Sequence, residues 1–284
     1  MEILNVGVVG FGQMGTGIAQ VTASAGYKVI ACDVDQAYLD KGVARIGKNL
    51  DKAIEKGKIA DQDKQRVLGQ ISTTTQLEGL KDCQLVIEAV VENMSTKIEI
   101  FRKLDDICAP ETILSSNTSS LSITDMSAHT RRPEKFMGLH FFNPVHIMKL
   151  VEVVRTISTD DETYKTGSRF AESVGKTIVS CGDRPGFVVN RLLVPYLLDA
   201  IRILEDGTAT RDDIDTGMTL GCGHPMGPLT LTDFIGLDTI LYIADIMFIE
   251  FKDSHFAAPP LLRRMVNMGF MGKKSGKGFY DYTK

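Results

Sequence analysis

Residues 3–35 read ILNVGVVGFGQMGTGIAQVTASAGYKVIACDVD, and they give the strongest indication of the fold. An apolar strand pattern ends at Gly10, where GFGQMG opens a helical pattern that a second strand pattern follows. In such a unit Gly10 permits the tight turn, Gly12 lets the backbone approach a pyrophosphate, and Gly15 allows the helix to pack closely on the strand. The free N–H groups at the start of the helix then face the phosphates. The stretch therefore predicts a βαβ unit that binds a dinucleotide.

Asp33 follows the second strand of this unit, residues 28–32, about 20 residues beyond the glycine loop. A carboxylate there accepts hydrogen bonds from the adenosine ribose hydroxyls and repels a 2′-phosphate, and the next residue, Val34, is no arginine that could bind that phosphate. The predicted cofactor is therefore NAD rather than NADP, and Gln13 and Met14 within the glycine loop are expected to contact it. The alternative is a βαβ unit that binds no dinucleotide or that binds S-adenosylmethionine.

Composition and charge narrow the class of protein. The chain has 284 residues, of which 43% are hydrophobic, so it can bury a large core and is long enough for two domains. A net charge of -4 predicts no general attraction to nucleic acid or to an anionic membrane. The five cysteines are scattered without CxxC spacing, which indicates a reducing compartment and no structural metal. The longest apolar stretch, Ile240–Phe251, is too short to cross a bilayer, and no leader pattern precedes the first strand, so we expect a cytoplasmic protein.

Strand and helix patterns alternate again further on, with strands expected at 71–74, 84–89 and 112–116. This order predicts an α/β fold with a doubly wound, mostly parallel sheet of the Rossmann type. Polar residues follow the last two of these strands, and the carboxyl ends of parallel strands line the ligand crevice of such a sheet. They could also be simple helix caps. These residues are Glu92, Asn93, Lys97, Asn117, Thr118 and Ser119.

Residues 136–155, FMGLHFFNPVHIMKLVEVVR, hold a histidine and a carboxylate on two short apolar runs that an Asn-Pro turn joins. Glu152 is flanked by valines, and an unpaired charge in such a setting would cost several kcal/mol. Two strands joined by this turn would bring Glu152 against His140, hold the imidazole in one tautomer and make it a better base. On spacing alone, a core histidine beside an unrelated surface glutamate fits equally well.

The composition changes at residues 183–186, DRPG, beyond which helical patterns continue without strands. The expected helices span 188–205, 211–220, 228–250 and 260–267. The predicted domains are residues 1–184, a Rossmann-type NAD-binding domain, and residues 185–284, an all-α domain for substrate binding and dimerisation. The helix from Asn190 onward is apolar nearly all round, so a second subunit is its simplest cover. We therefore expect a homodimer.

The helix expected at residues 36–56 carries a stripe of five basic residues at steps of 4, 3, 4 and 4, which places them on one helical face. They are Lys41, Arg45, Lys48, Lys52 and Lys56. The stripe is either a solvated face or a phosphate-binding edge for a ligand such as coenzyme A.

Six motifs in a fixed order span nearly the whole chain. They are GFGQMG from Gly10, SSNTSSLSI from Ser115, GLHFFNPV from Gly138, MKLVEVV from Met148, RPGFVVNRLLVPY from Arg184 and GHPMGPLTLTDFIGLD from Gly223. Together they resemble the L-3-hydroxyacyl-CoA dehydrogenase family, and within it the short bacterial enzymes that act on 3-hydroxybutyryl-CoA. The resemblance implies an NAD-dependent oxidoreductase that interconverts (S)-3-hydroxybutyryl-CoA and acetoacetyl-CoA.

The resemblance also implies roles for single residues. His140 would be the catalytic base oriented by Glu152, while Ser119 and Asn190 would hold the C3 oxygen of the substrate. Asn143 would support the nicotinamide end of the cofactor. Further cofactor contacts are implied for Glu92, Lys97, Asn117, Ser119 and Lys274. Contacts with the coenzyme A substrate are implied for Lys52, Lys56 and Ser119.

Three alternatives stay open beside this function. They are a broad-chain-length hydroxyacyl-CoA enzyme of fatty-acid β-oxidation, a crystallin-like relative that binds NADH without useful turnover, and a β-hydroxyacid-type dehydrogenase that uses a lysine base. Two positions also depart from the family pattern. Asn49 stands where a phosphate-binding serine is frequent, and His146 stands where proline is common, so His146 is most simply a loop substitution.

Overall fold

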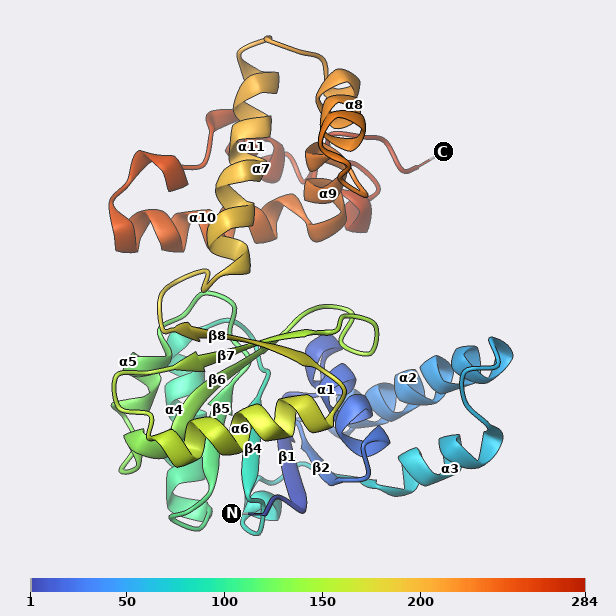
Figure 1. Cartoon of the computed structure of the whole chain (residues 1–284), viewed down its shortest axis with the longest axis vertical. Coiled ribbons are helices and arrows are strands. Elements are labelled where there is room, and N and C mark those ends of the chain that lie inside the picture. The colour runs from blue at the N-terminus through green and yellow to red at the C-terminus, as the bar shows by residue number, and fades with distance from the viewer. Residues whose placement is uncertain (1, 284) are drawn as a thin grey trace. The chain divides into compact units, whose positions relative to one another are not determined.

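The computed structural model describes residues 2–283 and divides into two compact units (Figure 1). The first unit ends at Asp183, and the second begins at Arg184. An eight-stranded sheet forms the centre of the first unit, whereas the second unit is built from helices. The predicted fold class, a Rossmann-type sheet followed by a helical domain, is confirmed.

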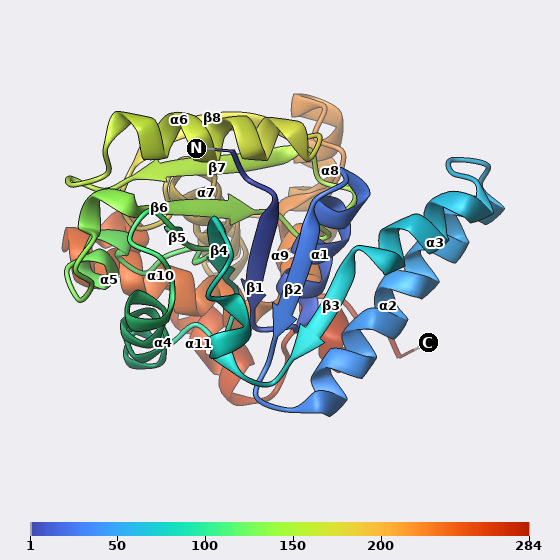
Figure 2. The same cartoon turned by 90° about the horizontal axis from the view of Figure 1, so that it is seen from below.

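The strands of the first unit lie in the order β3-β2-β1-β4-β5-β6-β7-β8 (Figure 2). All neighbours are parallel except β6 and β7, which are antiparallel. The strand order reverses between β1 and β4, where a doubly wound sheet places its ligand crevice. The bounds are β1 Asn5–Val9, β2 Lys28–Cys32, β3 Ile71–Thr74, β4 Leu85–Glu88, β5 Ile113–Ser116, β6 Phe136–Phe141, β7 Leu150–Arg155 and β8 Thr177–Gly182.

Helices cover both faces of this sheet. Apolar side chains of α1, α2, α3 and α6 form one cluster with the strands. On the other face, Phe101 of α4 packs edge-on against Phe136 of β6, with ring centroids 4.5 Å apart, and Ile123 of α5 lies against Gly138. The bounds are α1 Gln13–Ser24, α2 Gln36–Glu55, α3 Asp61–Gly69, α4 Met94–Ile107, α5 Ile123–Ser127 and α6 Asp161–Ser173, with single 3₁₀ turns η1 at Leu77–Leu80 and η2 at Pro133–Lys135.

The helices of the second unit pack around a separate apolar cluster. Their bounds are α7 Val189–Glu205, α8 Arg211–Cys222, α9 Pro228–Ile235, α10 Leu237–Phe251 and α11 Pro260–Asn267, with 3₁₀ turns η3 at Ser254–Phe256 and η4 at Lys273–Ser275. The single helix expected over residues 228–250 is wrong, because Gly236 adopts a φ of +109° and separates α9 from α10. That positive φ lies outside the helical region, and glycine reaches it without a Cβ clash.

Two buried carboxylates tie the C-terminal segment to the helices of the second unit. Asp233 accepts the backbone N–H groups of Phe279 and Tyr280 at 2.8 Å each, and Asp215 accepts the Tyr280 hydroxyl at 2.9 Å. Because each carboxylate is satisfied by several donors, these ties hold the segment after η4 in place. Within residues 2–283, no helix has the length and apolarity that a membrane crossing requires.

Candidate active site

The glycine loop between β1 and α1 has the shape of a phosphate cradle. Gly10 adopts a φ of +88°, and a Cβ there would lie 2.7 Å from the Ala89 carbonyl oxygen. A Cβ on Gly15 would lie 1.8 Å from the Gly10 carbonyl oxygen, so both positions require glycine. A Cβ on Gly12 would meet nothing within 4 Å. The loop is therefore packed against the protein at Gly10 and Gly15 and open at Gly12, which fits a pyrophosphate at the start of α1.

Asp33 lies next to this loop, at the carboxyl end of β2. Its Oδ2 accepts the backbone N–H of Phe11 at 2.6 Å, and its Oδ1 accepts the N–H of Val34 at 2.8 Å. Each oxygen keeps a second lone pair, so the carboxylate can still accept ribose hydroxyls. A hollow of about 460 Å³ begins beside it, which sequence reasoning did not predict because its lining comes from three separate segments. That lining includes Val34, Thr75, Gln76, Leu77, Glu78, Lys103, Asp106 and Ile107.

His140 and Glu152 face each other across the antiparallel pair β6–β7, in the register that the sequence spacing suggests. Glu152 is fully buried, and its Oε2 accepts a hydrogen bond from His140 Nδ1 at 2.7 Å. Because the carboxylate holds the proton on Nδ1, the other ring nitrogen, Nε2, is left as the acceptor. Ser119 Oγ lies 3.1 Å from that Nε2. The three side chains form a row in which the middle one can take and return a proton.

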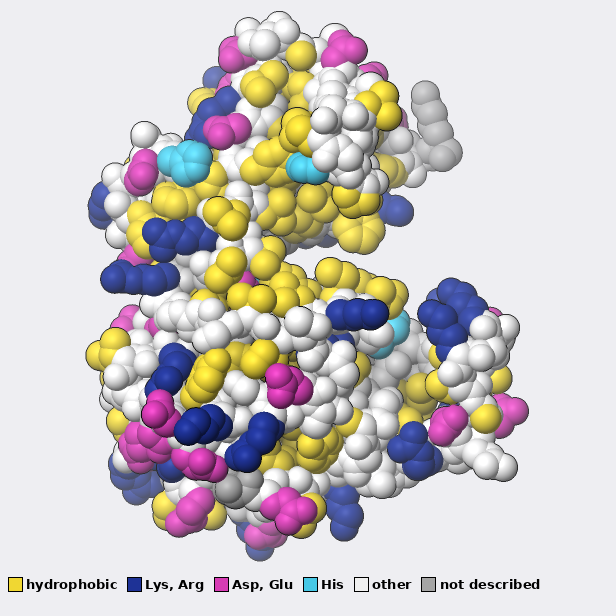
Figure 3. All heavy atoms as spheres, viewed as in Figure 1, with side chains coloured by type: hydrophobic (Ala, Val, Ile, Leu, Met, Phe, Trp, Pro, Cys, Tyr) yellow, Lys and Arg dark blue, Asp and Glu magenta, His cyan; other side chains and the backbone are white. Residues whose placement is uncertain are grey.

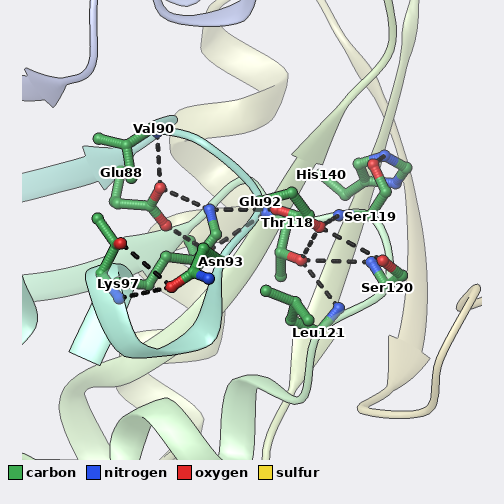
Figure 4. Close-up of polar contacts among 12 residues, drawn as sticks. Glu88, Val90, Glu92, Asn93, Lys97, Thr118, Ser119, Ser120, Leu121 and His140 are labelled. Atoms are coloured by element: carbon green, nitrogen blue, oxygen red, sulfur yellow. Dashed lines mark hydrogen bonds and ion pairs between the residues drawn. The ribbon is translucent and has the colours of Figure 1, made fainter. Parts of the chain in front are cut away.

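The loop that carries Ser119 is held by the carboxylate of Glu92 (Figure 4). Glu92 Oε1 accepts the Thr118 hydroxyl at 2.5 Å and the Ser119 N–H at 3.1 Å, and the Ser120 hydroxyl lies 3.4 Å away. These bonds bind Glu92 to three consecutive residues of the loop after β5. The position of Ser119 Oγ opposite His140 therefore depends on Glu92.

Glu92 is in turn joined to a buried ion pair. Lys97 Nζ lies 2.6 Å from Glu88 Oε1 and 3.2 Å from Glu92 Oε2, and Lys97 and Glu88 are 1% and 0% exposed. Glu88 also accepts the N–H of Val90 at 2.7 Å and the hydroxyl of Ser116 at 2.6 Å. We call these three charged residues the Glu88–Lys97–Glu92 network. Sequence reasoning missed Glu88, although a carboxylate inside the apolar run QLVIEA carries the same signal as Glu152 does in its strand.

The amides predicted near the cofactor lie at neighbouring strand ends. Asn117, just after β5, accepts the backbone N–H of Phe141 at 2.8 Å. Asn143, just after β6, accepts a hydrogen bond from Gln13 Nε2 of α1 at 3.0 Å, which links the turn after β6 to the glycine loop. Asn93, in contrast, is a helix cap, because its Oδ1 accepts the N–H of Thr96 at the start of α4.

A basic groove runs along α2 and consists of two hollows of about 460 and 940 Å³. Asn49 and His146 line both of them. Figure 3 shows basic side chains at the end of α2 and on the wall across from it. The basic residues of the lining are Arg45, Lys52, Lys56, Lys58 and Lys149, and none of the described lining residues is acidic. Lys41 and Lys48, the other members of the basic stripe, are exposed on α2 outside the lining.

Asn49 in this groove donates a hydrogen bond from its Nδ2 to Gln20 Oε1 of α1 at 2.9 Å. Two further predicted residues, Asn190 and Lys274, belong to the second unit. Asn190 lies in the first turn of α7, and Lys274 in η4 forms an ion pair with Asp238 of α10 at 2.5 Å. Their roles stay predictions.

The glycine cradle, the carboxylate at the end of β2 and the His140 row define the class of an NAD-dependent dehydrogenase with a Rossmann-type sheet. Comparison with known proteins agrees with this class. Residues 5–184 match the family model described as 3-hydroxyacyl-CoA dehydrogenase, NAD binding domain, and residues 186–282 match the model of the C-terminal domain of the same enzymes. The chain belongs to the 3-hydroxyacyl-CoA dehydrogenase family.

Individual relatives cover all or nearly all of the chain. A 3-hydroxybutyryl-CoA dehydrogenase of Mycobacterium tuberculosis is 52% identical over 99% of both chains, and one of Clostridioides difficile is 46% identical over 99% of this chain and 100% of its own. The crystal structure of M. tuberculosis FadB2 has 51% identity and a TM-score of 0.97, with all of both chains covered. That of (S)-3-hydroxybutyryl-CoA dehydrogenase PaaH1 from Ralstonia eutropha has 43% identity, the same TM-score and the same coverage.

Proposed function

We propose that this chain interconverts (S)-3-hydroxybutyryl-CoA and acetoacetyl-CoA with NAD(H). The observation that carries the proposal is the row from Ser119 through His140 to Glu152, with distances of 3.1 and 2.7 Å. The names of the relatives that match over the full length support the substrate class. The open Gly12 and the Asp33 carboxylate support NAD as the cofactor.

In the oxidation direction, His140 Nε2 accepts the proton of the C3 hydroxyl. Glu152 then stabilises the imidazolium through the buried Nδ1–H bond, which strengthens as positive charge develops on the ring. Ser119 Oγ, at 3.1 Å from Nε2, positions the same substrate oxygen. NAD, when bound, supplies the acceptor of the C3 hydride. In the reverse direction protonated His140 returns the proton to the oxygen of acetoacetyl-CoA, and Asn190 assists as a second hydrogen-bond donor.

The remaining predicted residues hold the two ligands. The glycine loop, with Gln13 and Met14, takes the pyrophosphate, and Asp33 takes the adenosine ribose. Further cofactor contacts are proposed for Glu92, Lys97, Asn117, Asn143 and Lys274. The basic groove receives the phosphates of coenzyme A through Lys52 and Lys56, which is supported by the absence of acidic groups among its described lining residues.

We also propose that the protein is a cytoplasmic homodimer that associates through the helical unit, residues 185–284. Large apolar side chains of this unit are exposed, and their burial against a second copy would be favourable. They include Leu192, Leu220, Phe234, Ile249 and Met268. The cytoplasmic location is supported by the cofactor and substrate, which are intracellular metabolites. Sedimentation equilibrium tests the dimer, and a monomer at micromolar concentration would contradict it.

The test of the function is to mix the protein with acetoacetyl-CoA and either NADH or NADPH and to follow the loss of reduced cofactor. Turnover with NADH well above that with NADPH is expected, because Asp33 repels a 2′-phosphate. Binding of NADH without turnover would favour the crystallin-like alternative. No reaction with either cofactor would overturn the proposal.

A broad-chain-length hydroxyacyl-CoA dehydrogenase is the second candidate. It is favoured by one relative, the mitochondrial hydroxyacyl-coenzyme A dehydrogenase of Sus scrofa, which is 44% identical over 99% of this chain. A series of 3-ketoacyl-CoA substrates of rising chain length separates the two candidates. A fall in kcat/KM beyond four carbons supports the short-chain enzyme, and flat values support the broad one.

A further inference from the structure

His146 lies where the two hollows of the basic groove meet, because it lines both of them. It belongs to the turn after β6 and stands opposite α2, which supplies Arg45 and Asn49 to the smaller hollow and Lys52 and Lys56 to the larger one. The sequence alone suggested only a loop substitution at this position. In the fold, this imidazole is the one histidine among the described residues that line the groove.

A buried lysine fixes the turn that carries His146. Lys176 is 8% exposed, and its Nζ donates hydrogen bonds to the carbonyl oxygens of Val145 at 2.5 Å and Met148 at 2.8 Å. Within the turn, the N–H groups of residues 147 and 148 both bond to the Pro144 carbonyl at 2.9 Å. The backbone on both sides of His146 is therefore held, and the imidazole is presented to the groove from a fixed support.

We propose that His146 is a specificity-determining residue for the coenzyme A part of the substrate, which it binds as an imidazolium after taking up a proton from solvent. The proposal rests on the proposed function, since it assumes that the phosphates of an acyl-CoA enter the basic groove. An imidazolium at the meeting point of the two hollows would add a charge-assisted hydrogen bond to a phosphate oxygen. The residue then discriminates a coenzyme A thioester from a thioester without phosphates.

The charges around His146 make its protonation depend on the ligand. The His146 side chain is exposed by surface area, but neighbouring protein atoms partly desolvate it, which is the largest effect that lowers its pKa; the ammonium groups of Lys176 and Lys52 lower it further. Beside Lys52, the charged residues among the described residues that line the groove are Arg45, Lys56, Lys58 and Lys149, and all are cationic. In the free protein these cations favour the neutral ring. A bound phosphate offsets part of this positive charge and favours the imidazolium, so binding should take up a proton.

The affinity for coenzyme A should depend on pH, because the protonation of His146 does. The protonated ring binds phosphate more tightly, so the contribution of His146 to affinity is present at low pH and is lost as the pH rises. A difference of one pKa unit between free and bound states changes affinity at most about tenfold. We therefore expect that the contribution of His146 to the affinity for coenzyme A is about 3- to 10-fold larger at pH 6 than at pH 8.

The experiment measures the binding of coenzyme A itself by titration calorimetry, in two buffers of different ionisation enthalpy, at pH 6, 7 and 8. The 3′-phosphate of coenzyme A titrates near pH 6, so the readout is the difference between the wild type and His146→Asn. The wild type should take up more protons on binding than His146→Asn. His129→Asn, which changes an exposed histidine outside the groove, should behave as the wild type.

A second measurement uses acetoacetyl-N-acetylcysteamine, a thioester without phosphates, as the substrate with NADH. His146→Asn should reduce this thioester at the wild-type rate, while its KM for acetoacetyl-CoA at pH 6 rises about 3- to 10-fold. If His146→Asn binds coenzyme A too weakly for calorimetry yet turns over the short thioester normally, the proposal is also supported. Equal proton uptake and equal KM values in the wild type and His146→Asn would overturn it. Failure of the proposed function looks different, since the wild type would then turn over neither thioester.

Discussion

Replacement of Glu88 by glutamine tests the buried network that holds the Ser119 loop. Glu88 and Lys97 are 0% and 1% exposed and 2.6 Å apart, so Glu88→Gln leaves a buried ammonium with less compensating charge. Removal of one partner from a buried pair costs about 3–5 kcal/mol. Glu92, 3.2 Å from the same Nζ, offsets part of this cost, and the amide oxygen of glutamine keeps a neutral hydrogen bond. We therefore expect a net loss of about 2–3 kcal/mol in the free energy of unfolding.

A loss of that size lowers the melting temperature by about 4–12 °C in a unit of this length. Because Lys97 also anchors Glu92, we expect Ser119 Oγ to lose its fixed position opposite His140 and kcat to fall about tenfold. The measurements are thermal unfolding by circular dichroism and steady-state kinetics with acetoacetyl-CoA and NADH. Glu99→Gln, an exposed glutamate on α4, is the matched control and should change neither quantity. A Glu88→Gln protein with the melting temperature and kcat of the wild type would show that the buried network does not hold the Ser119 loop.

Three further predictions concern the catalytic row and one surface ion pair. His140→Gln should keep the affinity for NADH within a few-fold of the wild type and lower kcat by about 10² to 10⁴. A fluorescence titration measures the affinity, and steady-state kinetics measure kcat. Full activity in this variant would exclude His140 as the base. Glu152→Gln should lower kcat about 10- to 150-fold, because a hydrogen bond to a charged group contributes about 1.5–3 kcal/mol. An unchanged kcat would show that the carboxylate charge is not needed. Burial raises the pKa of Asp160, but hydrogen bonds from Lys135 and Thr163 outweigh it and lower that pKa to about 2. The ionised Asp160 therefore stabilises the fold above about pH 4, and this stabilisation is lost as the pH falls towards 2. Asp160→Asn should narrow the difference in melting temperature between pH 7 and pH 3. An unchanged difference would contradict this prediction.

Local patterns predicted most of the first unit because neighbouring residues decide them. The strand, glycine loop and helix of residues 3–35 follow from apolar spacing and from positions that only glycine tolerates, as the contacts of Gly10 and Gly15 show. The charge of Glu152 inside an apolar strand indicated that it needs a partner nearby, but the spacing left open whether this partner is His140, and the structure shows the contact between them. Elements with weak patterns were missed. Helix α3, Asp61–Gly69, was not predicted, since it buries little apolar surface beyond Val67.

In the second unit, the prediction failed to divide one long helix in two. The apolar pattern over residues 228–250 continues through Gly236, and a periodic pattern does not reveal where a glycine takes a positive φ. The burial of Asp215 and Asp233 was not predicted, although each accepts several hydrogen bonds from residues far away in the sequence. Such partners cannot be paired from the sequence, because no spacing rule joins them.

The class of fold and the NAD preference expected from Asp33 follow from residues that are close together in the chain, whereas the spacing of His140 and Glu152 suggested their pairing without deciding it. Which side chains support these groups becomes clear only in the folded chain. Glu88 and Lys97 meet beneath the Ser119 loop, and Lys176 meets the carbonyls beside His146, across 9 and about 30 residues of chain. The physical reason is that a buried charge selects its partner by distance and desolvation in the folded protein, and a one-dimensional pattern contains neither.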